Sequence, residues 1–195
     1  AAQVFFDHGH YGVGLKRFEN IVNTIPATTQ GKTSARILIG FYYEQSKWSD
    51  VISWASKMVS IKELRDDSSL MTLRNTLYAQ AIFNRANAAE KASDYTNATA
   101  DFLLFQKEFP NNPSADRALY NASLNQQKAS NLEDSMATAK KMIDTYPRSS
   151  LRADAMANLG ESYEALADLG SAAKWYTELG TRFPSDKRSA TALYN

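Results

Sequence analysis

The 195-residue sequence contains no cysteine and only two histidines. Without cysteine there can be no disulfide, no thiolate metal ligand and no thiol nucleophile. His8 and His10 lie beside Asp7, but a metal would need further ligands in a fixed geometry, which the sequence does not supply. A Ser-His-Asp or Cys-His catalytic arrangement is not expected either, because the sequence has no cysteine and only these two histidines. We therefore expect no catalytic residue, no metal site and no cofactor, and a protein that is not an enzyme.

Long apolar runs, concentrated charge and phosphate-binding loops are also missing. No stretch approaches 18 apolar residues, so no transmembrane helix is expected. The 22 basic and 21 acidic residues give a net charge of +1 without a run of five like charges. Nucleic acid and anionic membrane surfaces are therefore not expected partners, because both require a concentrated basic patch. The glycines at 9–14 lack both a preceding strand and the Lys-Ser/Thr of a phosphate loop.

Proline is scarce, but its placement is periodic. Four of the five prolines follow an isoleucine or an aromatic residue, at Pro26, Pro110, Pro147 and Pro184. The last three are 37 residues apart, and the first precedes the second by 84. An independent series shows the same period of 37, with one interval of 47, at Tyr11, Trp48, Tyr95, Leu132 and Leu169. A fixed period of this size, with one insertion of ten residues, predicts a solenoid of repeated units.

Each repeat is predicted to be a pair of antiparallel helices. The second helix carries apolar residues at i, i+4, i+7 and i+11, as in Ala172, Tyr176, Leu179 and Phe183. Proline ends this helix, and the connections are short, so neighbouring helices must run antiparallel. The first helix has a matching stripe that includes Gly160. A small residue there allows close helix packing, and added bulk would cost about 1–3 kcal/mol.

The predicted fold is therefore all-α, an α-solenoid of antiparallel helix pairs with about five repeats and truncated ends. The repeats are expected at approximately 1–26, 31–64, 68–110, 113–147 and 150–184, followed by the start of a further helix at 186–195. The ten extra residues indicate a first helix lengthened between Leu70 and Ala92, or a separate short helix near Leu70 to Tyr78. They could form a binding feature or only a spacer. Both ends fall inside helical patterns, so we expect a piece of a longer chain.

The pattern resembles the tetratricopeptide repeat (TPR) family. Leu159-Gly160, Tyr163, Ala172, Tyr176 and Pro184 fall at that family's marked spacings, although the period is 37 rather than 34 and Ser135 stands where alanine is preferred. The longer period and the phrases at 109–120 and 146–150 resemble TPR proteins of the bacterial cell envelope, such as the Bam-complex assembly lipoprotein, the Tol-Pal coordinator and gliding-machinery proteins. This resemblance implies a right-handed superhelix, a non-catalytic scaffold for a protein or peptide partner, and a periplasmic or outer-membrane-associated location. A cytoplasmic location is the alternative.

The resemblance also implies a concave groove lined by the first helices. Positions one step round from the predicted core stripe would face this groove. They combine aromatic, aliphatic, arginine and amide side chains, a profile typical of binding hot spots: Arg36, Tyr43, Phe83, Asn87, Arg117, Tyr120, Leu124 and Gln127, with Phe6 in the first repeat. Packing between helices could instead bury some of the aromatics. The acidic positions Asp154, Glu161 and Glu164 are interpreted as a solvated face.

Two other functions remain open from the sequence. The chain could be the regulatory or substrate-recruiting arm of a larger enzyme, in which case a catalytic domain would flank it in the same gene. It could also self-associate, because both ends are expected to expose unfinished apolar stripes. A signal peptide or lipobox in the full reading frame would favour the envelope scaffold instead.

Overall fold

The computed structural model describes residues 2, 4 and 8–188. The chain separates into two compact units, Ala1–Arg85 and Ala86–Asn195, which are considered one at a time. Of the sequence predictions, Phe6 and most of the helix expected at 186–195 lie outside the described residues.

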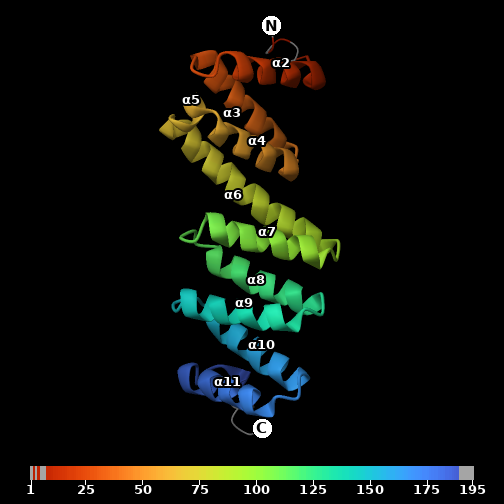
Figure 1. Ribbon diagram of the computed structural model, residues 1–195, viewed down its shortest axis with the longest axis vertical. Coiled ribbons are helices and arrows are strands. Elements are labelled where there is room, and N and C mark those ends of the chain that lie inside the picture. The colour runs from red at the N-terminus through yellow and green to blue at the C-terminus, as the bar shows by residue number, and fades with distance from the viewer. Residues whose placement is uncertain (1, 3, 5–7, 189–195) are drawn as a thin grey trace. The chain divides into compact units, whose positions relative to one another are not determined.

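The N-terminal unit consists of α2 (Tyr11–Thr24), α3 (Thr29–Glu44), α4 (Trp48–Ser60), the single turn α5 (Lys62–Arg65) and most of α6 (Ser68–Lys91). The C-terminal unit contains the end of α6 and then α7 (Tyr95–Glu108), α8 (Ala115–Lys128), α9 (Leu132–Thr145), α10 (Arg152–Ala165) and α11 (Leu169–Arg182). Within each unit, Figure 1 shows the helices following one another in chain order. None of the described helices is long and apolar enough to cross a membrane.

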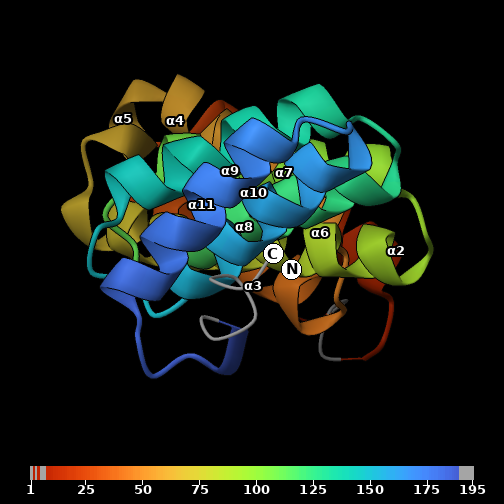
Figure 2. The ribbon, with the colours of Figure 1, turned by 90° about the horizontal axis from the view of Figure 1, so that it is seen from below.

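Each inner helix of a unit packs against the helix before it and the helix after it. In the N-terminal unit α3 contacts α2 and α4, and in the C-terminal unit α8 contacts α7 and α9. Further along, α10 contacts α9 and α11, and Figure 2 shows α11 covering α10. The predicted all-α fold, an α-solenoid of helix pairs, is confirmed.

The insertion of ten residues lengthens a first helix, as one of the two sequence interpretations expects. α6 has 24 residues, whereas α7 to α11 have 14 each. The alternative of a separate short helix near Leu70 to Tyr78 is wrong, because α6 runs through that stretch without a break. The short helix α5 precedes it, and the Asp67 carboxylate accepts a hydrogen bond from the Leu70 amide at 2.9 Å to cap α6.

The series of aromatic and leucine markers corresponds to one repeated turn. Tyr11, Trp48, Tyr95, Leu132 and Leu169 are each the first residue of a helix. Two positions before each marker stands a residue with positive φ: Gly9 (79°), Ser46 (53°), Ser93 (60°), Ser130 (61°) and Ala167 (57°). A left-handed residue just after a helix is the usual way to end it, with the next amide donating back to the helix. The Asp168 amide, for example, donates to the Tyr163 carbonyl at 2.9 Å.

The proline markers correspond to a second kind of turn. In each, the residue before proline accepts a hydrogen bond from the amide three positions on, as in Asn112 to Phe109 at 3.0 Å and Ser149 to Tyr146 at 3.0 Å. The same bond joins Thr28 to Ile25 and Asp186 to Phe183. Proline therefore occupies the second position of a four-residue turn, where its fixed φ is favourable. The two markers of the sequence period are the two turns that join the helices.

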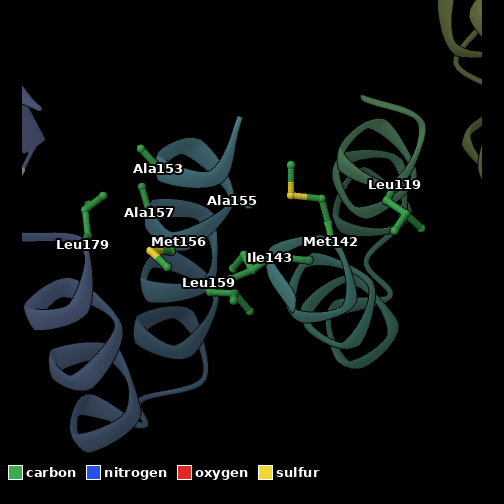
Figure 3. Packing of buried hydrophobic residues seen from close by; sticks show 10 residues of the cluster. Leu119, Met142, Ile143, Ala153, Ala155, Met156, Ala157, Leu159 and Leu179 are labelled. Atoms are coloured by element: carbon green, nitrogen blue, oxygen red, sulfur yellow. The ribbon is translucent and has the colours of Figure 1, made fainter. Parts of the chain in front are cut away.

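The core of the C-terminal unit is a layer of aliphatic and methionine side chains shared by four helices. Leu119 belongs to α8, Met142 and Ile143 to α9, Met156 to α10 and Leu179 to α11, and all are at most 2% exposed. Figure 3 shows the α10 side chains lying between those of α9 and α11. Each helix therefore buries its apolar face only against its neighbours, as expected of a repeat array.

At Gly160, α10 lies against the Tyr176 side chain of α11. A Cβ atom added there would overlap the ring of Tyr176, whose hydroxyl donates to the Glu164 carboxylate at 2.9 Å. The ring is held at both ends, so it has little freedom to move away. We expect Gly160→Ala to lower the free energy of unfolding by about 1–3 kcal/mol, measured by urea denaturation, because the contact is overpacked.

Gly170 provides the matched control for Gly160, because a Cβ there meets nothing closer than the Asp168 carboxylate at 3.7 Å. Gly170→Ala should stabilise by about 0.5–1 kcal/mol through helix propensity alone. Truncating the ring with Tyr176→Ala should remove most of the cost of Gly160→Ala. An equal stability change at both glycines would contradict the packing argument.

The left-handed turn before α11 gives a second prediction. Ala167 adopts φ 57°, a conformation that is strained for any residue with a Cβ and relaxed for glycine. Ala167→Gly should therefore raise the free energy of unfolding by about 1 kcal/mol in urea. Ala173→Gly, at an exposed position inside α11, should lower it by about 1 kcal/mol. Destabilisation by both substitutions would show that the turn is not strained.

Candidate functional site

In the C-terminal unit, four of the predicted groove residues lie on one face of α8. The spacing of Arg117, Tyr120, Leu124 and Gln127 places them on one side of a helix. Arg117 is exposed and the other three are half-buried, whereas Leu119 and Ala122 on the opposite side are fully buried. Packing of the array buries the second set completely and the first set only in part, so the first set forms a surface, which we call the α8 face.

Tyr120 is the anchor of the α8 face. Its ring packs against the core cluster that contains Met156, Ala157 and Leu159 of α10, so its position is fixed. Burial raises the pKa of the Tyr120 hydroxyl above its usual value, and Asp154 and Glu161 raise it further, whereas Arg188 lowers it. The charged groups acting on this hydroxyl are therefore two carboxylates of α10 and one guanidinium that follows α11.

Arg188 forms ion pairs with one carboxylate of α10 and one in the segment that follows α11. Its Nη2 atom lies 2.7 Å from Asp154 Oδ1 and 2.6 Å from Asp186 Oδ2. The Arg188 guanidinium and backbone amide both donate to Asp186, which lowers the pKa of that carboxyl to about 2. The two carboxylates in turn raise the pKa of Arg188. All three side chains lie at the surface, so salt screens these attractions.

The predicted residues of the N-terminal unit are largely occupied by contacts between helices. Arg36 of α3 donates to Ser69 Oγ of α6 at 2.9 Å, and the Tyr43 ring meets the Trp48 ring edge-on at 5.6 Å between centroids. Phe83 is half-buried. These packing contacts are the alternative that the sequence left open for the aromatic residues.

An open pocket of about 290 Å³ nevertheless lies along α3, lined by Arg36, Ile37, Gly40, Phe41 and Glu44. Asn87, half-buried on α6, belongs to the C-terminal unit. The eight predicted residues are thus divided between the two units, and a single groove that contains all of them stays a prediction.

A pocket that the sequence did not predict lies at the loop edge of the C-terminal unit. Its volume is about 530 Å³, and two proline turns, 110–113 and 146–149, form its walls together with Asp116 and Thr145. The Tyr146 hydroxyl donates to the Pro110 carbonyl at 2.9 Å, and the Ser149 hydroxyl donates to the Asp116 carboxylate at 2.5 Å. The recurring Pro110 and Pro147 were the available signal, since equal turns in successive repeats must lie beside each other.

The two histidines lie just before α2. His8 Nδ1 lies 2.8 Å from the Val4 carbonyl, and His10 stands at the start of α2. Within residues 2, 4 and 8–188, no three histidine or acidic side chains are grouped closely enough to hold a metal ion.

The charge network around Arg188 predicts a specific titration. The pKa of Asp186 in the folded protein, about 2, lies below its ordinary value of 3.8. The stabilisation from this group is therefore complete above pH 4 and is lost as the pH falls toward 2. NMR titration of the Asp186 carboxyl carbon should show a midpoint near 2, and Arg188→Ala should move it back toward 3.8.

Arg182→Ala is the control for this titration, because Arg182 pairs with Glu178 at 2.8 Å instead. The Asp186 midpoint should be the same in Arg182→Ala as in the unsubstituted protein. A midpoint that stays near 2 in Arg188→Ala would show that Arg188 is not the cause.

Comparison with known proteins identifies no family. No protein-family model and no curated protein sequence matches the chain. Among solved structures it is similar to the TPR domain of P58(IPK), with a TM-score of 0.48, 12% identity, and coverage of 99% of this chain and 52% of that one. The chain therefore spans about half the length of that structure. It is also similar to the MamA RS-1 ArsTM double mutant (TM-score 0.47, 18% identity, 88% of this chain and 97% of that chain covered). A third similar structure is PilW, described as a widely conserved type IV pilus biogenesis factor (TM-score 0.49, 14% identity, 98% and 94% covered).

Proposed function

We propose that the chain is a non-catalytic scaffold that binds a protein or peptide partner on the exposed face of its first helices. The observation that carries the proposal is the α8 face. Arg117, Tyr120, Leu124 and Gln127 lie together on the side of α8 that is not fully buried, with Tyr120 packed against the core cluster. An arginine, an aromatic, an aliphatic and an amide side chain on a rigid helix are what a partner segment needs for anchoring and hydrogen bonding.

Preorganisation makes this surface suitable for binding. Tyr120 is half-buried and packed against the core cluster, so little side-chain entropy is lost when a partner covers its exposed part. Arg117 is exposed, and no hydrogen bond or ion pair of its guanidinium is present in the described part of the chain. It is therefore available to a carboxylate or a backbone carbonyl of the partner.

The envelope location is the finer part of the proposal. It is supported by the resemblance of the 37-residue period and of the phrase at 109–120 to the envelope group of TPR proteins. Fractionation of the source cells, with an antibody against this chain, tests the location directly. Recovery only in the cytosolic fraction would discard the envelope assignment and leave the binding role standing.

The binding role predicts that the α8 face controls affinity. Peptides selected from a random 12-residue display library on the purified protein should bind in fluorescence anisotropy. Arg117→Glu should weaken the best of them about tenfold, because a hot-spot side chain is replaced by one of opposite charge. Its melting temperature should be unchanged, since the Arg117 side chain does not contribute to the core.

Lys174→Glu is the matched control, because it makes the same charge change at an exposed position on α11. Affinity should be close to that of the unsubstituted protein. If the selected peptides bind Arg117→Glu and Leu124→Ala as tightly as the unsubstituted protein, the α8 face is not the binding surface. Analytical ultracentrifugation at two concentrations shows whether a second copy of the chain occupies the face instead.

A further inference from the structure

A basic side chain of the protein itself already lies beside the α8 face. Arg188 follows α11 and reaches Asp154 in the first turn of α10, 34 positions earlier in the chain, with an Nη2 to Oδ1 distance of 2.7 Å. Asp154 is one of the three charged groups that act on the Tyr120 hydroxyl. The guanidinium therefore binds a carboxylate at the edge of the surface for which a binding role is proposed above.

Besides Arg152 at its first position, the charged residues of α10 are acidic. Asp154 and Glu161 are seven residues apart, which places them along one line of the helix. Ala157 between them is buried in the cluster against which Tyr120 packs. Glu161 is exposed, and no ion pair of its carboxylate is present in the described part of the chain. If Arg188 leaves, the two carboxylates that act on the Tyr120 hydroxyl lose the guanidinium that pairs with one of them.

A guanidinium group matches this arrangement better than other side chains. It is planar, permanently charged, donates two parallel hydrogen bonds to a carboxylate and stacks on aromatic rings. We propose that the surface formed by Tyr120, Asp154 and Glu161 binds an arginine side chain of the partner segment. This proposal rests on the proposed function and specifies the partner's chemistry. Arg188 is the internal substitute that occupies Asp154 when no partner is bound.

The ion pair of Arg188 is weak enough to be exchanged. Its side chain is 43% exposed and that of Asp154 39%, and exposed pairs contribute little because water and salt compete with them. Asp186, only two residues before Arg188, can keep its own contact at 2.6 Å after Asp154 is released. Displacement therefore costs one exposed contact, and the partner's arginine replaces it while also covering the Tyr120 ring.

Blocked tripeptides with a central arginine, citrulline or glutamate test the proposal by NMR titration of the folded protein. Citrulline has the shape of arginine without its charge. We expect only the arginine peptide to shift the amide signals of Tyr120, Asp154 and Glu161. Its affinity should rise about two- to fivefold in Arg188→Ala, which removes the internal competitor. Glu161→Gln should lower the affinity by a similar factor.

Matched variants separate local competition from long-range charge. Lys187→Ala removes the same charge from the neighbouring exposed residue and should leave the affinity unchanged. Asp144→Asn, on an exposed carboxylate of α9 that pairs with Lys140 at 3.5 Å, should also have no effect. Asp154→Asn in the Arg188→Ala background should remove the gain.

Two results would overturn the inference: equal shifts with the citrulline and arginine peptides, or no gain in affinity in Arg188→Ala. The proposed function is tested separately by the display-selected peptides. If their binding still depends on Arg117 while the tripeptides show no preference for arginine, the scaffold role stands and the arginine site is discarded. If substitutions at Arg117 and Leu124 leave the affinity of the selected peptides unchanged, the α8 face is not the binding surface, and the tripeptide result does not alter that conclusion.

Discussion

The two alternating turns are the constraint on which the rest of the structure depends. A left-handed residue ends each first helix, and a proline turn follows most of the second helices. Both reverse the chain within a few residues, so consecutive helices must lie antiparallel and in contact. From Tyr95 onward, each helix between two such turns has 14 residues. Where the proline turn is missing, between α4 and α6, the single turn α5 takes its place and the helix that follows has 24 residues.

Much of the fold could be predicted because the turns are visible as local sequence signals. Proline after an aromatic residue, and an aromatic or leucine at the start of each second helix, give the period directly. The need for a small residue at position 160 also follows from local spacing, and the structure places the Tyr176 ring against it. The left-handed turn itself was not predicted. Glycine is the residue that indicates a left-handed conformation, and most of these turns have serine or alanine at that position. At Ala167 nothing in the side chain indicates a φ of 57°.

The candidate site was harder to predict because exposure depends on neighbours that the sequence does not place. Arg36 and Tyr43 are one step round from the core stripe, as are Arg117 and Tyr120. The first two contact Ser69 and Trp48, respectively, whereas Arg117 stays exposed. Asp154 was interpreted as part of a solvated face, and the structure shows it bound to Arg188. That pair joins residues 34 positions apart, a separation that no helical spacing rule covers.

Local helix structure explains some of the acidic residues in the first helices but not all of them. Asp116 and Asp154 lie in the first turns of α8 and α10, where a carboxylate is favoured by the helix dipole whatever its function. Asp116 also accepts hydrogen bonds from Ser149 and from the Arg117 amide. Glu161 lies in the middle of α10, away from the positive end of the helix, and is exposed. Glu161 acts electrostatically on the Tyr120 hydroxyl and is not explained by helix capping, so among these acidic residues it bears most directly on the proposed arginine site.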